Sequence, residues 1–365
     1  MYVDSLALKN YRNIDTLDIN FSDGINIFYG DNAQGKTNIL ESLFIAATTK
    51  SHKNSKDKDI IEFGFDEAHI RLGLKKRDVG HRIDMHLRRN GNKGVAVDGI
   101  PIRRSTELFG MINMVFFSPE DLSIVKNGPA ERRRFMDMEI CQLSRIYYSN
   151  LLNYNKVLNQ RNNLLRQIYF NPSLKDTLDV WDDQLFEYGQ GVIRERKNFL
   201  NLMNDIIKSI HSGLTGDKEE IELIYEPNTA EEDFREALRN KRDYDIKNSA
   251  TMTGPQRDDF GIFIDGKDVR VFGSQGQQRT AALSLKLAEI ELVKRIINDD
   301  PVLLLDDVMS ELDTGRRNAL LESLEGIQTI ITCTGYDDFI RERISIDRIY
   351  RVEKGTVREV RNGTE

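Results

Sequence analysis

Cysteine is scarce in this sequence, which has two cysteines among 365 residues. Cys141 and Cys333 lie far apart and have apolar neighbours, so we expect buried free thiols; a disulfide between them is the weaker alternative. This usage is typical of a reducing cytoplasm. Residues 1–4 begin a predicted strand and lack the basic and apolar regions of a secretion signal, so we expect a cytoplasmic protein.

Long apolar runs and an excess of positive charge are also missing. No apolar segment approaches the length needed to span a bilayer, so we expect no membrane partner. The formal net charge of −7 gives no overall attraction to nucleic acid, and DNA binding would need a local basic surface. With 39% hydrophobic and 30% charged residues, the chain is expected to fold into one large or two medium globular domains.

What the sequence does contain is a complete phosphate-binding P-loop. The pattern G-x-x-x-x-G-K-[ST] is filled by Gly30, Asp31, Asn32, Ala33, Gln34, Gly35, Lys36 and Thr37. A predicted strand over residues 25–29 precedes it, and residues 38–47 have helical spacing. A chance glycine turn would rarely fill every fixed position in this context, so we favour a nucleotide site, with Asn38 as a further binding candidate.

The chemistry of this motif follows from its geometry. Gly30 and Gly35 allow the backbone N–H groups to point at phosphate oxygens, and the positive end of the helix dipole adds to the attraction. Lys36 is expected to reach the β- and γ-phosphates, and the Thr37 hydroxyl to bind Mg²⁺.

Two polar segments in the C-terminal part add further candidates. The apolar run 301–305 predicts a buried strand that leads into Asp306 and Asp307, whose carboxylates suit Mg²⁺ and a water nucleophile. The polar loop 273–280 precedes a predicted helix and includes Ser274, a suitable first residue for a helix, so it is a second potential anion site.

Two cationic regions leave two interpretations open. Arg12 lies in a turn before the strand that leads to the P-loop, and is either a solvated turn charge or a residue near the nucleotide. Residues 75–104 carry nine Lys or Arg against three Asp, partly in a hairpin turn with an Asn-Gly signal. A solvated sheet face is one interpretation, and we favour contact with DNA phosphates. The candidates are Lys75, Lys76, Arg77, Arg88, Arg89 and Lys93.

The middle of the chain predicts an antiparallel helical hairpin. Apolar residues recur at steps of three and four over residues 140–168, where Arg161 interrupts the row, and again over 178–210. Asn171-Pro172 marks the turn between them. The acidic segment 217–236 that follows is interpreted as a solvated rim.

In this order, the motifs resemble an ABC-type ATPase head of the SMC-like class. Its elements are the P-loop, a Ser-x-Gly-Gln segment, a buried strand with paired aspartates, and Ser310-Glu311-Leu312-Asp313. Finer motifs resemble the RecF family of bacterial recombination mediators over almost the whole chain. They are residues 10–13, 30–38, 117–122, 253–259 and 274–279.

The resemblance implies an α/β fold, an ABC/SMC-like P-loop ATPase head with an antiparallel β subdomain. Residues 1–130 and 250–365 would form the head, and residues 131–249 an inserted coiled-coil hairpin arm. It also implies a protein of DNA replication and recombinational repair that binds ATP and Mg²⁺ and dimerises with ATP. The protein would bind DNA at duplexes or single/double-strand junctions without sequence preference, and would help to load recombinase with RecO and RecR.

The resemblance assigns further site residues. Lys36 would hold phosphate, and Thr37 and Asp306 would hold Mg²⁺. The γ-phosphate of the nucleotide on the other subunit would contact Ser274, Gly276 and Gln277, and Asp313 would lie at the same interface. Hydrolysis would therefore require a dimer, because a signature segment cannot reach its own P-loop.

Three departures from the general ABC pattern predict weak, slow ATP hydrolysis that acts as a release switch. Asp307 stands where a glutamate is usual, Ser118 falls about where SMC heads have a glutamine, and residues 332–334 lack the switch histidine. Acid–base roles for the five histidines are not expected. Two alternatives are a transporter-type nucleotide-binding subunit, which the long hairpin disfavours, and a small-molecule P-loop kinase, which the signature segment disfavours.

Overall fold

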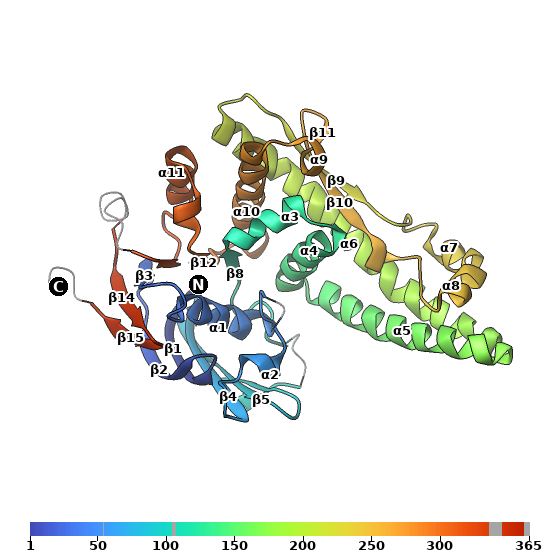
Figure 1. Ribbon diagram of the computed structural model, residues 1–365, viewed down its shortest axis with the longest axis horizontal. Coiled ribbons are helices and arrows are strands. Elements are labelled where there is room, and N and C mark those ends of the chain that lie inside the picture. Colours follow the sequence, from blue (N-terminus) through green and yellow to red (C-terminus); the bar gives the residue numbers. More distant parts are fainter. Residues whose placement is uncertain (54, 104–106, 336–344, 361–365) are drawn as a thin grey trace. The chain divides into compact units, whose positions relative to one another are not determined.

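The computed structural model describes residues 1–53, 55–103, 107–335 and 345–360 (Figure 1). The chain forms two compact units, one of Met1–Asp121 with Glu289–Glu365 and the other of Leu122–Ala288. Arg104, one of the nine basic residues counted above, lies outside the described residues. Cys141 and Cys333 are both buried thiols that form no disulfide, as expected.

The first unit contains an antiparallel sheet with the strand order β2-β1-β4-β5-β6-β7. Its strands are β1 (Tyr2–Tyr11), β2 (Ile14–Asn20), β4 (Glu67–Lys76), β5 (Val79–Arg88), β6 (Gly94–Val97) and β7 (Ile100–Pro101). Alternate residues of β4 and β5 are buried, which is the pattern of a sheet with one face on the core. The predicted Asn-Gly hairpin is confirmed, because β5 pairs with β6 and places Met85 opposite Val95.

The second sheet of this unit is mainly parallel and has the order β15-β14-β3-β13-β12-β8. Its strands are β3 (Ile25–Tyr29), β8 (Met114–Phe117), β12 (Val302–Asp306), β13 (Thr329–Cys333), β14 (Arg348–Glu353) and β15 (Thr356–Glu359). Every residue of β8, β12 and β13 is buried, as expected for parallel strands covered on both faces. The expected α/β head with an antiparallel β subdomain is thus confirmed.

Helix α1 (Lys36–Thr48) lies between the two sheets and contacts β4 and β5 of one and β8, β12 and β13 of the other. It is buried almost all round, so it has little amphipathic character. Further described elements of the unit are α2 (Asp57–Ile60), the 3₁₀ turns Pro119–Asp121 and Val308–Glu311, α11 (Thr314–Ser323), and the end of α10 (Gln275–Ile297) from residue 289. The unit therefore fixes the start of α1, and with it the P-loop, from both sides.

The second unit is built around a long helical hairpin (Figure 1). Helix α5 (Arg145–Phe170) packs along α6 (Leu178–Thr215), with a 3₁₀ turn over Pro172–Thr177 between them, so the predicted turn at Asn171 is confirmed. The Ser144 hydroxyl accepts a hydrogen bond from the Tyr147 N–H and starts α5. Further helices of this unit are α3 (Leu122–Lys126), α4 (Pro129–Leu143), α7 (Phe234–Asn240) and α8 (Arg242–Asn248).

The acidic segment after the hairpin is more than a solvated rim. It forms β9 (Ile221–Glu226) and leads into α7, whose Phe234 and Leu238 pack on Tyr154 and Leu185 of the hairpin. Most of its carboxylates are exposed, whereas Ile221, Leu223 and Phe234 are buried. The hairpin therefore carries a third layer of helix and strand and is not a bare two-helix coiled coil.

Pairing of β9 explains why the second unit extends beyond the expected arm. β9 pairs with β10 (Asp259–Ile264) in the sheet β11-β10-β9. The elements that follow β10 are β11 (Lys267–Asp268), α9 (Val269–Phe272) and α10 (Gln275–Ile297). Residues 250–288, assigned to the head from the sequence, thus fold with the helices, and the expected boundaries at 130 and 250 do not coincide with those of the compact units.

The motif at residues 253–259 forms part of a buried ion-pair network in this unit. Asp258 is fully buried and accepts hydrogen bonds from Arg196, Tyr225 and the backbone of Asn228. Asp259 forms an ion pair with Arg132 of α4 at 2.7 Å. These charges join α4, α6 and β10, so the motif has a structural role that its sequence did not reveal.

Candidate nucleotide site

The P-loop connects β3 to α1 through two positions that require glycine. Gly30 has a φ of +154°, and a Cβ atom there would lie 2.3 Å from the Val352 carbonyl oxygen. Gly35 has a φ of +111° at the residue before α1. Because L-residues rarely adopt such angles, both glycines are needed for the loop to curl as predicted.

Two turns of the first unit brace the loop at Gln34. Asn13 donates to the Gln34 carbonyl oxygen at 3.2 Å and accepts from the Asn38 amide at 2.8 Å. On the other side, the Lys354 N–H donates to the Gln34 side chain at 2.6 Å and the Gly355 N–H to its carbonyl oxygen at 2.9 Å. Asp31, Asn32 and Ala33 are exposed at the tip. These contacts hold the loop in its curled shape.

Lys36 is the buried cation of the site. Only 6% of it is exposed, and its ammonium donates to the carbonyl oxygens of Gly30 at 2.6 Å and Asp31 at 2.8 Å. Both partners are neutral carbonyl oxygens, and none of the ion pairs among the described residues includes Lys36. A buried charge without a counter-charge is costly, so the position favours an anionic ligand.

Thr37 and Asp306 meet at the end of β12, as the motifs predict. The Thr37 hydroxyl donates to Asp306 Oδ1 at 2.8 Å, and the Thr332 hydroxyl donates to the same oxygen at 2.7 Å. Hydroxyl and carboxylate oxygens are the donors that Mg²⁺ prefers, so these residues fit that ion. Thr332 belongs to the segment that lacks the switch histidine, and its hydroxyl orients the Asp306 carboxylate.

Asp307 follows in a left-handed backbone conformation with a φ of +54°. Its N–H donates to the Thr332 hydroxyl at 3.1 Å, which fixes the turn after β12. Asp tolerates this conformation better than most residues. The backbone therefore holds Asp307 next to Asp306, and its role toward water stays a prediction.

Arg12 is anchored to α1 and is not a freely solvated turn charge. Its guanidinium donates to both carboxylate oxygens of Glu41, at 2.8 and 2.9 Å, and also to the Ser55 hydroxyl. Burial raises the pKa of Glu41, but hydrogen bonds from Arg12 and Ser51 outweigh it and hold the pKa below its usual value. Direct contact between Arg12 and nucleotide stays a prediction.

The signature residues belong to the second unit. Helix α10 already begins at Gln275, so most of this segment is helical rather than a loop. Ser274 and Gln277 exchange hydrogen bonds between backbone N–H and side chain, at 2.9 and 3.2 Å, which forms a capping box. Ser274 and Gly276 are exposed, and Gln277 also donates to Glu219.

Asp313 has a local structural role in the first unit. Its carboxylate accepts from the Arg316 N–H and so caps α11, and it forms an ion pair with the Arg316 guanidinium. This cap explains an aspartate at this position without a ligand. Its predicted place at a dimer interface stays untested.

The six candidate DNA-binding cations are mostly engaged within the first unit. Lys76 donates to the Gly110 carbonyl oxygen, Lys93 forms an ion pair with Asp57 at 3.0 Å, and Lys75 lies over the Tyr2 ring. Arg88 approaches Glu67 at 4.0 Å, and Arg89 approaches Asp66 at 3.7 Å and donates to the Phe65 carbonyl oxygen. Arg77 is exposed in the β4–β5 turn. These contacts reduce the net positive surface that the sequence suggested.

Sequence reasoning missed the residues that orient the site rather than bind the ligand. Asn13, Glu41 and Thr332 each act on a site residue at least 25 positions away in the chain. No spacing rule connects such positions. Only the motif over residues 10–13 gave a signal, and it indicated the segment without the role of Asn13.

The fold and the site together define an ABC/SMC-like P-loop ATPase head. A family profile described as "RecF/RecN/SMC N terminal domain" matches residues 2–358. The SMC head domain of Pyrococcus furiosus bound to the C-terminal domain of ScpA aligns with a TM-score of 0.56 at 16% identity, over 98% of this chain and 96% of that one. That likeness supports the fold alone.

Closer relatives narrow the class. The chain is 61% identical to the DNA replication and repair protein RecF of Lachnoclostridium phytofermentans and 58% identical to that of Lachnospira eligens, in both cases over 98% of this chain and 99% of the relative. A solved structure described as the recombination mediator protein RecF with ATP in the RecFOR pathway has a TM-score of 0.91 and 36% identity, over 99% of this chain and 98% of that one. The chain belongs to the RecF family.

Among the described residues, the helices are too short or too polar to cross a bilayer.

Proposed function

We propose that the protein binds ATP and Mg²⁺ at the P-loop and acts as an ATP-switched DNA-binding protein in replication and recombinational repair. The observation that carries the proposal is Lys36, a buried cation that faces only carbonyl oxygens among the described residues. The β- and γ-phosphates of a nucleotide would supply the missing negative charge. The relatives named RecF, and the RecF structure described with ATP, support this assignment.

Each residue of the site has a role that its contacts permit. The exposed loop residues 31–33 would present N–H groups to phosphate, and Thr37 and Asp306 would hold Mg²⁺. Bound Mg²⁺ neutralises charge on the phosphate oxygens. Asp307 would orient water for hydrolysis, and because it is one methylene shorter than the usual glutamate, we expect slow turnover and a cytoplasmic switch rather than a motor.

ATP would also join two copies of the chain. The Ser274 side chain is exposed at the start of α10, and Ser274, Gly276 and Gln277 would contact the γ-phosphate on the partner, with Asp313 at the same interface. The dimer would bind the DNA backbone at a duplex or a single/double-strand junction without sequence preference. By family resemblance, RecO and RecR would act with it in loading recombinase.

The experiment that tests the switch is fluorescence anisotropy of a labelled gapped duplex at fixed salt. The protein is titrated with ATP and Mg²⁺, with ADP and Mg²⁺, and without nucleotide. We expect tight binding only with ATP. Equal binding in the three states would mean that the nucleotide controls another step, and no binding in any state would return the transporter-type and kinase alternatives.

A second experiment tests the contact across the dimer. We expect Ser274→Arg to bind ATP normally but to stay monomeric, because a bulky cation would occupy the interface. Ser173→Arg, at an exposed site in the hairpin turn of the same unit, is the matched control. Sedimentation with ATP measures both, and normal dimers of Ser274→Arg would rule out the contact.

A further inference from the structure

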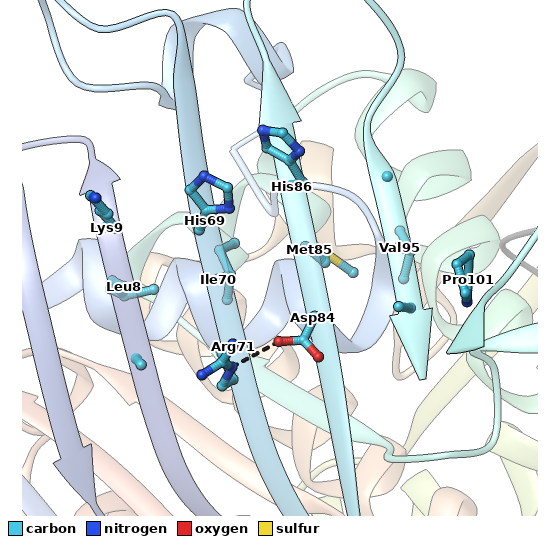
Figure 2. Close-up of a pocket in the computed structure, with 13 residues that line it drawn as sticks. Leu8, Lys9, His69, Ile70, Arg71, Asp84, Met85, His86, Val95 and Pro101 are labelled. Atoms are coloured by element: carbon cyan, nitrogen blue, oxygen red, sulfur yellow. Dashed lines mark hydrogen bonds and ion pairs between the residues drawn. The ribbon is translucent and has the colours of Figure 1, made fainter. Parts of the chain in front are cut away.

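Three potential metal ligands gather on the outer face of the antiparallel sheet, apart from the residues of the nucleotide site. Glu67 and His69 are two residues apart on β4, so their side chains point to the same face. His86 on β5 is the direct cross-strand partner of His69. Figure 2 shows the two imidazoles side by side on neighbouring strands. One donor atom from each of the three residues lies within 4.8 Å of the other two.

The donor atoms of this cluster are spaced almost as the ligands of a metal ion are. The rings of His69 and His86 stack with centroids 4.3 Å apart, and His86 Nε2 lies 2.9 Å from Glu67 Oε2. A tetrahedral ion with bonds of about 2.0–2.2 Å keeps its donors about 3.4 Å apart. The three side chains are exposed or half-buried, so small rotations can bring their donor atoms to this separation without moving the strands.

The surroundings leave room for a fourth ligand. Both histidines line a shallow depression of about 580 Å³ on the sheet face, which also includes Lys9, Arg71 and Pro101 (Figure 2).

We propose that Glu67, His69 and His86 form a binding site for a divalent transition-metal ion of the zinc type. Two imidazoles and one carboxylate are a donor set that zinc accepts, whereas Mg²⁺ and Ca²⁺ prefer oxygen ligands alone. Three protein donors leave one position for water or for a ligand in the depression. The ion joins β4 to β5 and so stabilises this sheet.

Arg88 is the natural competitor of the ion. It lies opposite Glu67 on β5, with its Nε 4.0 Å from Glu67 Oε1 and its Nη2 3.3 Å from His86 Nδ1. A bound metal replaces this exposed cation as the counter-charge of Glu67. Arg88→Ala removes the guanidinium and should therefore strengthen metal binding. If Arg88 only supported the fold of the sheet, the same substitution would weaken metal binding.

The test is a zinc titration of the full-length protein after removal of metal by a chelator. Excess Mg²⁺ is added to keep Zn²⁺ from the proposed magnesium site at Thr37 and Asp306. A chromophoric chelator reports the concentration of free Zn²⁺. We expect one Zn²⁺ per chain, with affinity at least about tenfold weaker in His69→Ala and in His86→Ala, because even outer partners of metal ligands are worth about 10–100-fold. His81→Ala is the matched control, since His81 also lies on β5 but pairs with Asp98.

A thermal melt gives an independent readout. Zn²⁺ should raise the melting temperature of the unaltered protein and of His81→Ala, but not that of His69→Ala or Glu67→Gln. Circular dichroism without zinc checks that each variant folds. The proposal is overturned if zinc binds His69→Ala and the unaltered protein equally, or if neither binds it.

Discussion

The two units of the molecule treat buried charge in opposite ways. In the helical unit, Arg161 is completely buried and pairs with Asp182 at 2.6 Å and Asp245 at 2.7 Å. In the nucleotide-binding unit, Lys36 is almost as deeply buried, but its described partners are carbonyl oxygens of its own loop. The first charge is neutralised within the fold, and the second is left for a ligand.

This difference teaches how to separate structural charges from functional ones. Burial of a charge does not by itself identify a site, because Arg161 and Arg196 are exposed by no more than 2%. What distinguishes Lys36 is that its described partners carry no counter-charge, beside a loop whose residues 31–33 are exposed. The same criterion places the motif with Asp258 among the structural elements, since Arg196 and Tyr225 already satisfy that carboxylate.

The substitution Lys36→Ala tests this difference between the two units most directly. We expect ATP binding to weaken by about 30- to 5,000-fold, because loss of a buried charged partner costs about 2–5 kcal/mol. With it, ATP-driven dimers should disappear. Folding stability should be unchanged or higher, since the variant removes an ammonium without a carboxylate. Isothermal titration with Mg²⁺ and ATP measures the first effect, and thermal melting the second.

Lys58→Ala, at an exposed lysine of α2 in the same unit, is the control for Lys36→Ala and should bind ATP normally. Normal ATP-driven dimers of the Lys36 variant would contradict the P-loop assignment. A strong loss of stability would instead contradict the contrast between the two units.

The complementary change in the helical unit is Arg161→Met. It leaves the fully buried Asp245 without its guanidinium, and we expect the free energy of unfolding to fall by about 3–5 kcal/mol. Nucleotide affinity at the P-loop should not change. Urea unfolding followed by circular dichroism measures the loss.

Arg166→Met tests the same substitution at an exposed position of the same helix, where it should cost less than about 0.5 kcal/mol. The double variant Arg161→Met with Asp245→Leu should recover part of the stability, because no unpaired charge remains at that position. Equal losses in Arg161→Met and Arg166→Met would show that the buried pair is not what holds α5, α6 and α8 together.

Much of the first unit could be predicted from the sequence because its signals are local. The P-loop, the strand that ends at Asp306 and the Asn-Gly hairpin are each defined by residues that are neighbours in the chain. The alternation of β4 and the buried run of β12 also follow from period and composition alone.

What the sequence could not predict depends on pairs that are distant in the chain. Arg161 looked like an interruption of an apolar row, because Asp245 lies 84 residues away. The unit boundary was missed for the same reason: β9 and β10 pair across more than 30 residues, so residues that follow a motif of the head fold with the helices. The predicted capping role of Ser274 needed only local information, and it is confirmed.

The ion pair between Arg12 and Glu41 near the P-loop is intermediate between the paired Arg161 and the unpaired Lys36, because it is only partly buried. We expect Arg12→Ala to cost about 1–3 kcal/mol near pH 7, because the buried Glu41 carboxylate loses charged donors. The pKa of folded Glu41 is held below its usual value, so this stabilisation is complete above the unfolded pKa and is lost as the pH falls through the folded one. Urea unfolding between about pH 7 and pH 3 should show a steeper decline in the unaltered protein than in Glu41→Gln.

If the Glu41 carboxylate did not cause this decline, stability would fall equally steeply in both proteins. The Arg12–Glu41 pair would then contribute as little to stability as an exposed ion pair. Ser55→Ala removes a neutral partner of Arg12 and leaves the ion pair in place. It should keep the pH dependence of the unaltered protein while lowering stability by less than about 1 kcal/mol.

The smallest effect is expected at the exposed basic hairpin. Reversing both charges with Arg88→Glu and Arg89→Glu should weaken DNA binding and reduce the slope of log K against log salt by at most about 2, the limit for two phosphate contacts. Because Arg89 already donates to the Phe65 carbonyl oxygen and lies near Asp66, the change should be smaller than that limit. The control is Arg71→Glu with Arg82→Glu, whose guanidinium groups share Asp84 on the same sheet and are therefore less available to phosphate. Equal salt slopes for the two double variants would mean that the hairpin with Arg88 and Arg89 is a solvated sheet face. Charges that already have partners within either unit, whether buried or exposed, would then take no part in DNA binding.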